Sequence, residues 1–185
     1  MTECELKYMI SHEEYLSLLH GYMSGAVTVP QVNYYYDTPS LDMNGAGITC
    51  RIRERHGHYT ATVKVHSEQH SGESTEHSKA VRDAWDTSLF TPFGVSYCGS
   101  LMTDRTAKCP TGGIVIMLDR NTYLGTVDFE IEIEHAKEKR SEAEAVARQL
   151  ASEAGFELRP SRLSKSERFF RKLLESNRNT NNTLS

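Results

Sequence analysis

The sequence predicts an α+β domain in which antiparallel strands predominate and helices lie between or outside them. Short runs of alternating polar and apolar residues recur along the chain, and this two-residue period is that of a β-strand. Turn-forming residues separate the runs at short intervals, so consecutive strands can pair antiparallel. Three Ser-x-x-Glu sequences mark helix starts. The runs amount to about seven or eight strands, and 185 residues suit one domain with a sizeable core.

The first predicted strand covers residues 3–9. Its alternation places Glu3, Glu5 and Lys7 on one face and apolar side chains on the other. Ser11 and Glu14 can then form a capping box, in which each side chain accepts a hydrogen bond from the other residue's backbone N–H. We therefore expect a helix directly after this strand.

A second strand and a β-hairpin follow. Residues 31–36 are rich in Val and Tyr and predict a strand. Residues 48–55 and 59–65 predict two strands joined by a tight turn. The return strand carries Lys64 on the same face as two threonines. The first strand of the hairpin presents three basic side chains on one face: Arg51, Arg53 and Arg55.

The middle of the chain has a weaker pattern. Residues 73–77 predict a short strand. Residues 79–89 have the apolar spacing of a helix, with Trp85 anchoring that helix to the core. Residues 90–101 are mixed in pattern and predict no single element.

The most informative stretch is residues 127–134, where acidic and apolar residues alternate strictly. Residues 114–119 form an apolar strand that we expect to pair with it. Glu130, Glu132 and Glu134 point the same way, with neighbours roughly 6–7 Å apart. Two anions at that spacing repel by about 0.6 kcal/mol in bulk water but by about 2.5 kcal/mol at an effective dielectric of 20. If this face lines an enclosed cavity, it needs cations.

The C-terminal part predicts two helices and a tail. Ser141 and Glu144 can form a second capping box, and the helix that follows ends at Gly155. Ser164 and Glu167 can form a third, at the start of a last helix. The polar stretch that follows has little to bury. We expect one domain over residues 1–175 and a disordered polar tail over residues 176–185.

Composition excludes several classes of function. The net charge of -4 and the lack of a dominant basic block argue against nucleic-acid binding. The four cysteines form no CxxC pair, so neither a zinc site nor a disulfide framework is indicated. No segment approaches membrane-spanning length and none has the pattern of a secretory signal, so we expect no membrane partner and a cytoplasmic location.

Two interpretations of the charged strand faces remain open at this point. An antiparallel sheet can expose one charged face to water, in an interaction domain with no metal or phosphate site. Alternatively, the strands close into a barrel and turn the charged faces inward. A polar interior that holds both acids and bases suits a divalent cation bound together with a polyanion, because hard cations take carboxylate oxygens whereas Arg and Lys take phosphate oxygens.

Short charged motifs favour the second interpretation, among them Glu3-Cys4-Glu5-Leu6-Lys7, Cys50-Arg51-Ile52-Arg53 and Glu130-Ile131-Glu132. In these motifs and their order the sequence resembles, over residues 1–172, the CYTH family, the triphosphate tunnel metalloenzymes. The N-terminal Glu3-Cys4-Glu5-Leu6-Lys7 fits the ExExK signature of that family. The small stand-alone bacterial members are the most similar in character. Further pieces recur in the family's order: Tyr35-Tyr36-Asp37-Thr38-Pro39, Cys50-Arg51-Ile52-Arg53, Thr62-Val63-Lys64, Leu118-Asp119 and Glu130-Ile131-Glu132.

The resemblance implies a closed antiparallel eight-stranded β-barrel, a tunnel with flanking helices that holds a triphosphate and Mg²⁺ or Mn²⁺. By analogy, the metal ligands would be Glu3, Glu5, Asp119, Glu130, Glu132 and Glu134. The residues that would bind the triphosphate are Lys7, Arg51, Arg53, Lys64, Arg105 and Lys165. Those with a catalytic role would be Glu5, Arg53, Lys64, Arg105 and Lys165. Glu134 could instead be a solvated acid at the rim of the tunnel, with no metal-binding role. Lys165 could instead be an ordinary exposed lysine at the start of a helix.

The resemblance implies metal-dependent hydrolysis of a triphosphate at one of its phosphoric anhydride bonds. The substrate is either inorganic tripolyphosphate or an organic triphosphate, such as thiamine triphosphate or a nucleotide. The partner is then a small molecule, and the chain is a monomer or a homodimer. Two alternatives use the same tunnel: an adenylyl cyclase that acts on ATP, and a non-catalytic sensor that binds polyphosphate or a nucleotide.

Overall fold

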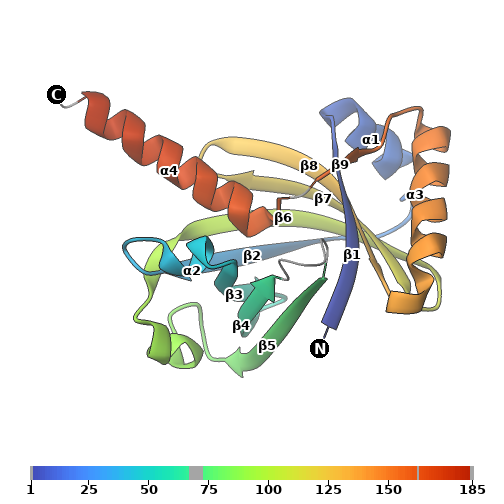
Figure 1. Ribbon diagram of the computed structural model, residues 1–185. Helices are drawn as coiled ribbons and strands as arrows, with labels where there is room; N and C mark the ends of the chain where they lie inside the picture. Colours follow the sequence, from blue (N-terminus) through green and yellow to red (C-terminus); the bar gives the residue numbers. More distant parts are fainter. Residues whose placement is uncertain (1, 67–72, 162, 184–185) are drawn as a thin grey trace.

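The computed structural model describes residues 2–66, 73–161 and 163–183. The described residues form one antiparallel sheet of nine strands that curves around an interior, with helices outside it and across one end (Figure 1). Among the helices in these ranges, none is both long enough and apolar enough to cross a membrane.

The strands β1 to β8 and the shorter helices come first along the chain, and the two long helices follow with β9 between them. The strands are β1 Thr2–Ile10, β2 Thr28–Asp37, β3 Ile48–Arg55, β4 His58–His66, β5 Glu73–Val81, β6 Ser96–Thr111, β7 Ile114–Tyr123, β8 Thr126–His135 and β9 Arg159–Pro160. The α-helices are α1 His12–His20, α2 Asp42–Gly45, α3 Arg140–Ala154 and α4 Lys165–Thr183, and the 3₁₀ helices are η1 Ser88–Phe93 and η2 Lys137–Lys139.

The predicted closed eight-stranded barrel is wrong. The sheet has nine strands, in the order β5-β4-β3-β2-β6-β7-β8-β1-β9, and it is not closed into a barrel along its length. β1 and β5 pair only over Thr2–Cys4 and Glu73–Thr75, at one end. Farther along β1, Tyr8 and Met9 pair with the short strand β9. The interior is therefore a strongly curved trough whose edges meet at a single corner.

The convex face of the sheet carries the main hydrophobic core. Apolar residues of β1, β7 and β8 face outward and pack against α1 and α3, with Ile116, Leu118 and Ile131 buried from the sheet and Tyr15 and Leu150 from the helices. Helix α1 begins at the predicted capping box of Ser11 and Glu14, which is confirmed. Because α1 and α3 use the apolar face of these strands, the charged face of the same strands is turned to the interior.

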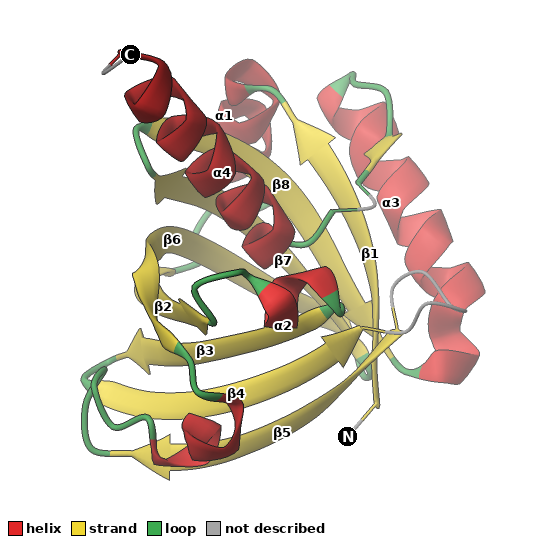
Figure 2. Ribbon diagram, turned by 60° about the vertical axis from the view of Figure 1, so that its left-hand side comes forward, coloured by secondary structure: helices red, strands yellow, loops and turns green. Residues whose placement is uncertain are grey.

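Helix α4 lies across the interior side of the sheet (Figure 2). Phe169 and Phe170 are buried against Tyr35, Leu101 and Tyr123, which belong to β2, β6 and β7. This second cluster holds the start of α4 at one end of the trough. Lys165, the first residue of the helix, is buried there.

The helix predicted over residues 79–89 is wrong. β5 extends to Val81, and turns and the 3₁₀ helix η1 follow it. Thr62 and Ser78 share a hydrogen bond of 2.9 Å between their hydroxyls across β4 and β5, so pairing along the edge of β4 has overridden the helical spacing. The prediction for Trp85 is also wrong, because its side chain is 65% exposed.

The C-terminal helices differ from the sequence-based expectation in two details. Helix α3 begins at Arg140 after a 3₁₀ turn, and no side chain caps it, because Glu144 pairs with Arg140 instead of forming a capping box with Ser141. Helix α4 continues to Thr183 and so includes most of the segment for which we expect disorder. Once the first turn is fixed, extending a helix by one residue costs little. Residues 184–185 lie outside the described residues.

Candidate active site

The interior of the sheet contains a charged cavity with an empty volume of about 560 Å³, openings included. Six strands and the start of α4 contribute side chains to it. The strand period places every second residue toward the cavity, so the charged residues of the alternating runs meet there. The residues that line it are Glu5, Lys7, Tyr35, Thr49, Arg51, Arg53, Lys64, His66, Arg105, Glu132, Glu134, Ser164, Lys165 and Ser166.

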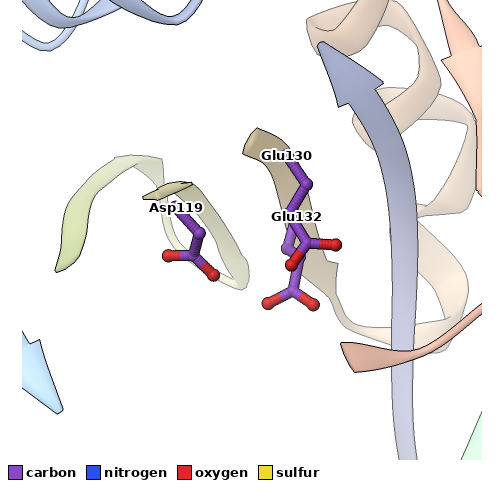
Figure 3. Close-up of side chains that lie close together, drawn as sticks. All are labelled: Asp119, Glu130 and Glu132. Atoms are coloured by element: carbon purple, nitrogen blue, oxygen red, sulfur yellow. The ribbon is translucent and has the colours of Figure 1, made fainter. Parts of the chain in front are cut away.

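Three carboxylates form what we call the acidic wall: Asp119 on β7, and Glu130 and Glu132 on β8. One oxygen of each lies within 4.8 Å of the others (Figure 3). Asp119 is directly opposite Glu130 in the strand pairing, and Glu132 follows two residues later on the same face. All three are buried. Such a cluster is unstable without positive charge beside it.

Lys165 and Arg105 supply that charge. The Lys165 ammonium lies 2.9 Å from Asp119 Oδ2 and 2.8 Å from Glu132 Oε1, and it also contacts Glu130. Arg105 Nη2 lies 2.6 Å from both Asp119 Oδ2 and Glu132 Oε2. Burial alone would raise the pKa of Glu132, but Lys165 and Arg105 hold that pKa well below its ordinary value. Glu132 is therefore ionised at neutral pH.

A second arginine supports the acidic wall from behind. Arg168 lies one helical turn after Lys165, and its Nη2 is 3.0 Å from Glu130 Oε1 while its Nε donates to Asp128 Oδ2 at 2.9 Å. Asn121 also donates to Glu130, at 3.0 Å. With Asp128 included, this group of described residues has four carboxylates and three cations, so it is one positive charge short of neutrality.

Four basic side chains form what we call the basic wall: Lys7, Arg51, Arg53 and Lys64. Lys7 lies on β1 beside the acidic wall, directly across from Glu132 in the strand pairing, and the other three lie on β3 and β4. Lys7 lies 2.8 Å from Glu5. Lys64 lies 2.9 Å from Glu76, and Arg51 lies 3.4 Å from the same carboxylate. Burial alone would lower the pKa of Lys64, but the nearby carboxylates raise it. Lys64 therefore stays charged, and Lys7, Lys64 and Arg51 each have a carboxylate partner.

Arg53 differs from its neighbours on the basic wall. Its Nε donates to Asn33 Oδ1 at 2.9 Å, and no carboxylate among the described residues lies within ion-pair distance of it. Burial, together with the nearby Arg51 and Arg105, lowers the pKa of Arg53. A buried guanidinium without an anionic partner is unfavourable, so an anion bound at this point would stabilise it.

The first turn of α4 positions Lys165. Ser164 and Glu167 form the predicted capping box, which is confirmed: Glu167 N donates to Ser164 Oγ at 3.2 Å, and Ser164 N donates to Glu167 Oε2 at 2.7 Å. Ser166 Oγ lies 2.8 Å from Thr49 Oγ1, which ties the same turn to β3. The Lys165 side chain is only 8% exposed, so it is not the exposed helix-start lysine that the sequence left as an alternative.

The acidic wall fits a hard divalent cation. Its donors are carboxylate oxygens, which Mg²⁺ and Mn²⁺ prefer. Glu130 Oε2 is buried and has no hydrogen-bond partner among the described residues, and the surrounding group is one positive charge short. Among the described residues, Asp119, Glu130 and Glu132 therefore form a group that could hold a metal ion.

The structure brings most of the sequence-predicted site residues together. Asp119 and Glu130 belong to the acidic wall but are not among the residues that line the cavity. Glu134 is one of the lining residues. The Glu3 backbone pairs with Ser74, but its side chain lies outside what the structure describes. The other predicted residues all line the cavity: Glu5, Lys7, Arg51, Arg53, Lys64, Arg105, Glu132 and Lys165.

Sequence reasoning missed several contributors. Glu76 pairs with both Lys64 and Arg51. It lies within the predicted strand of residues 73–77 and directly opposite Lys64 in the pairing of β4 with β5. Arg168 follows Lys165 by three residues, which places both on one face of a helix. Asn33 carries no charge, and no pattern in the sequence distinguishes it from an ordinary strand residue.

Comparisons with known proteins agree with this geometry. The model of the CYTH domain matches residues 1–170. A Bacillus subtilis protein named "Putative triphosphatase YjbK" is 28% identical over 150 residues, which cover 72% of this chain and 77% of that protein.

Solved structures share the fold. A Bacillus halodurans protein described as a putative adenylate cyclase superposes with a TM-score of 0.74 at 24% identity, over 91% of this chain and 97% of its own. A Hippeastrum protein described as a putative adenylyl cyclase with a dominant triphosphatase activity superposes with a TM-score of 0.71 at 18% identity, over 91% and 94%. With a family model that spans residues 1–170 and a matching fold, the chain belongs to the CYTH family.

Proposed function

We propose that the protein is a metal-dependent hydrolase that binds a triphosphate in the charged cavity. The observation that carries this proposal is the presence of both walls in one cavity: a cluster of three carboxylates and a group of four cations. A triphosphate with a divalent cation is the kind of ligand that satisfies both walls at once. The similarity to a protein named as a triphosphatase supports the same proposal.

The basic wall supplies binding and orientation. Arg51 and Arg53 lie two residues apart on one strand, and Lys7 and Lys64 face the same cavity from β1 and β4. Their charged donors would hold successive phosphate oxygens and keep the chain extended, so that the terminal phosphorus is presented in a fixed direction. Arg53 gains the most from this contact, because it has no carboxylate partner among the described residues.

The acidic wall would hold the metal ion through Asp119, Glu130 and Glu132. When bound, the ion neutralises charge that develops on the phosphate oxygens as the P–O bond breaks. The carboxylates would also orient the attacking water, and Arg105 and Lys165 contact Glu132 and keep it in place. Phosphoryl transfer of this kind depends on positioning and electrostatics, and no nucleophilic side chain is needed.

The test is phosphate release from tripolyphosphate, ATP and thiamine triphosphate, measured with Mg²⁺ and Mn²⁺ in turn. We expect metal-dependent release by the wild type and a loss of about hundredfold or more in Glu130→Gln, because several kcal/mol of electrostatic stabilisation depend on this carboxylate. Glu144→Gln, an exposed change on α3, is the matched control and should keep full activity. Undiminished turnover in Glu130→Gln would contradict the proposed site.

The same screen separates the two other uses of the cavity. Formation of cyclic AMP and pyrophosphate from ATP would identify an adenylyl cyclase. Tight binding of tripolyphosphate with no hydrolysis in the presence of either metal would identify a sensor. Release of inorganic phosphate is the result that the proposed hydrolase predicts.

A further inference from the structure

The Asn121 side chain on β7 is completely buried beside the acidic wall, and its amide group makes three hydrogen bonds. Its Nδ2 donates to Glu130 Oε1 at 3.0 Å and to Asp128 Oδ1 at 2.9 Å. Its Oδ1 accepts a hydrogen bond of 2.7 Å from the hydroxyl of Thr103 on β6, which is also completely buried. Both hydrogens of the amide are thus directed at carboxylates, and its oxygen is directed at a hydroxyl donor.

These surroundings favour one orientation of the Asn121 amide. In the reverse orientation its oxygen would face Glu130 and Asp128, two carboxylates that lie at ion-pair distance from Arg168 and act as hydrogen-bond acceptors. In the observed orientation the oxygen needs a buried donor, and the Thr103 hydroxyl supplies it. Without that hydroxyl the buried oxygen would lose its hydrogen-bond donor, which is unfavourable. Thr103 therefore stabilises the orientation in which Asn121 donates to both carboxylates.

The contacts of Glu130 decide which of its two oxygens is available to a ligand. Asn121 Nδ2 and Arg168 Nη2 each lie 3.0 Å from its Oε1. The Lys165 ammonium contacts the same oxygen. Glu130 Oε2 is buried and has no hydrogen-bond partner among the described residues. The carboxylate is therefore held through one oxygen, which leaves the other as a metal ligand in a fixed direction.

Thr103 and Asn121 owe their place beside the site to the strand pairing. They lie directly opposite each other across β6 and β7, and Arg105 and Asp119 form the same kind of pair two residues farther along β6. The strand period puts both pairs on the interior face. Arg105 lines the cavity, whereas neither Thr103 nor Asn121 does. The uncharged pair can therefore act on a ligand only through the residues that it holds.

We propose that Thr103 is a positioning residue for the metal site: its hydroxyl fixes the Asn121 amide, and that amide holds Glu130 with Oε2 directed to a divalent cation. The proposal rests on the proposed function, because it requires that the acidic wall binds a metal ion. Residues that orient a metal ligand in this way are worth about 10–100-fold in metal affinity. Thr103 should therefore affect the binding of metal but not the binding of phosphate at the basic wall.

The test is a pair of calorimetric titrations, one with Mg²⁺ alone and one with tripolyphosphate in EDTA. Thr103→Val removes the hydroxyl and keeps the shape of the side chain, and Thr103→Ala removes it without adding a methyl group. Thr103→Ser keeps the hydroxyl. Thr106→Val is the matched control, because Thr106 lies on the same strand, is also completely buried, and loses a hydrogen bond of 2.8 Å to the Thr28 hydroxyl.

We expect Thr103→Val and Thr103→Ala to bind Mg²⁺ about tenfold more weakly, with an unchanged affinity for tripolyphosphate. Thr103→Ser should restore most of the Mg²⁺ affinity, and Thr106→Val should match the wild type in both titrations. The proposal would be overturned by an unchanged Mg²⁺ affinity without the hydroxyl, by equal losses for both ligands, by no rescue in Thr103→Ser, or by an equal loss in Thr106→Val. A wild type that binds no Mg²⁺ would instead count against the proposed function itself.

Discussion

The central feature at the scale of single residues is the Lys165 ammonium within the acidic wall. It lies within ion-pair distance of all three carboxylates and is almost completely buried. Burial alone would lower the pKa of Lys165, but the three carboxylates raise it, so the group stays charged. Lys165 therefore occupies the neighbourhood in which a divalent cation would bind, and the two cations compete for the same oxygens.

This competition gives a prediction about metal affinity. Lys165→Met should bind Mg²⁺ about tenfold or more tightly in the absence of any phosphate ligand, because the carboxylates lose their resident positive charge. Calorimetric titration with Mg²⁺ measures this directly and does not depend on activity.

The control variant is Lys172→Met, which lies on the same helix and is 39% exposed, and its Mg²⁺ affinity should match that of the wild type. An unchanged or weaker Mg²⁺ affinity in Lys165→Met would show that Lys165 supports the metal site and does not compete for it.

The sequence predicted the site best where charge and strand period coincide. Arg51, Arg53 and Glu132 could be placed on cavity-facing positions because each lies in an alternating run with a clear inner face. Glu76 was missed although it lies in the predicted strand of residues 73–77, because those residues show no polar/apolar alternation that would identify the inner face. The sequence of residues 73–81 alone does not show that β4 needs a pairing strand along its edge.

At the scale of elements, the position of α4 depends on close packing against β6. Gly99 has φ +143°, and a Cβ at this position would lie 2.8 Å from Cζ of Phe169. The strand pairing shifts at this point, where Tyr35 pairs with Gly99 and Tyr36 with Tyr97, so β6 bulges beside the helix. A glycine in the bulge lets Phe169 approach and seats the first turn of α4 in the cavity.

We predict that Gly99→Ala destabilises the fold by about 1–3 kcal/mol and displaces α4, because the new methyl group overlaps the buried ring. Phosphate release should fall even at temperatures at which the variant remains folded, since Lys165 moves with the helix. Urea unfolding and a turnover assay on the same preparation measure the two effects.

Gly112→Ala is the matched control, because a Cβ at residue 112 meets nothing within 4 Å. Loss of stability with full activity in Gly99→Ala would mean that Phe169 packing does not position Lys165.

The helix starts show what the sequence can and cannot predict at this scale. The capping boxes at Ser11 and Ser164 were predicted correctly, since both reciprocal hydrogen bonds form locally. The box at Ser141 fails because a 3₁₀ turn precedes α3 and Glu144 pairs with Arg140. Competing local partners decide between these outcomes, and the Ser-x-x-Glu pattern alone does not show which partner is preferred.

At the scale of the whole molecule, the sheet collects charges that are far apart in the sequence. Side chains from β1, β3, β4 and β8 line one cavity, although β1 and β8 lie more than a hundred residues apart in the sequence. The order of strands in the sheet depends on pairings of this long range, such as β1 with β8 and β2 with β6. Sequence periodicity gives the face of each residue but not its neighbour across the sheet.

The incomplete closure of the sheet is also a property of the whole molecule. β1 and β5 overlap over only three residue pairs, and in this register the rest of β5 runs on past Thr2. β9, which is only two residues long, pairs with β1 farther along, at Tyr8 and Met9. A two-residue strand between α3 and α4 has no detectable period. The predicted barrel therefore failed because periodicity gives the inner face of a strand but not how far its neighbour overlaps it.

The central claim, that the interior binds a triphosphate, is tested most directly by thermal unfolding in EDTA with increasing tripolyphosphate. At a concentration of 100 times Kd the ligand should stabilise the fold by about 2.7 kcal/mol, which corresponds to a rise in Tm of roughly 5–10 °C for a chain of this size. We predict that Tm rises with ligand concentration in the wild type and that most of this rise is lost in Arg53→Gln. A wild-type Tm that does not respond to tripolyphosphate would contradict the account.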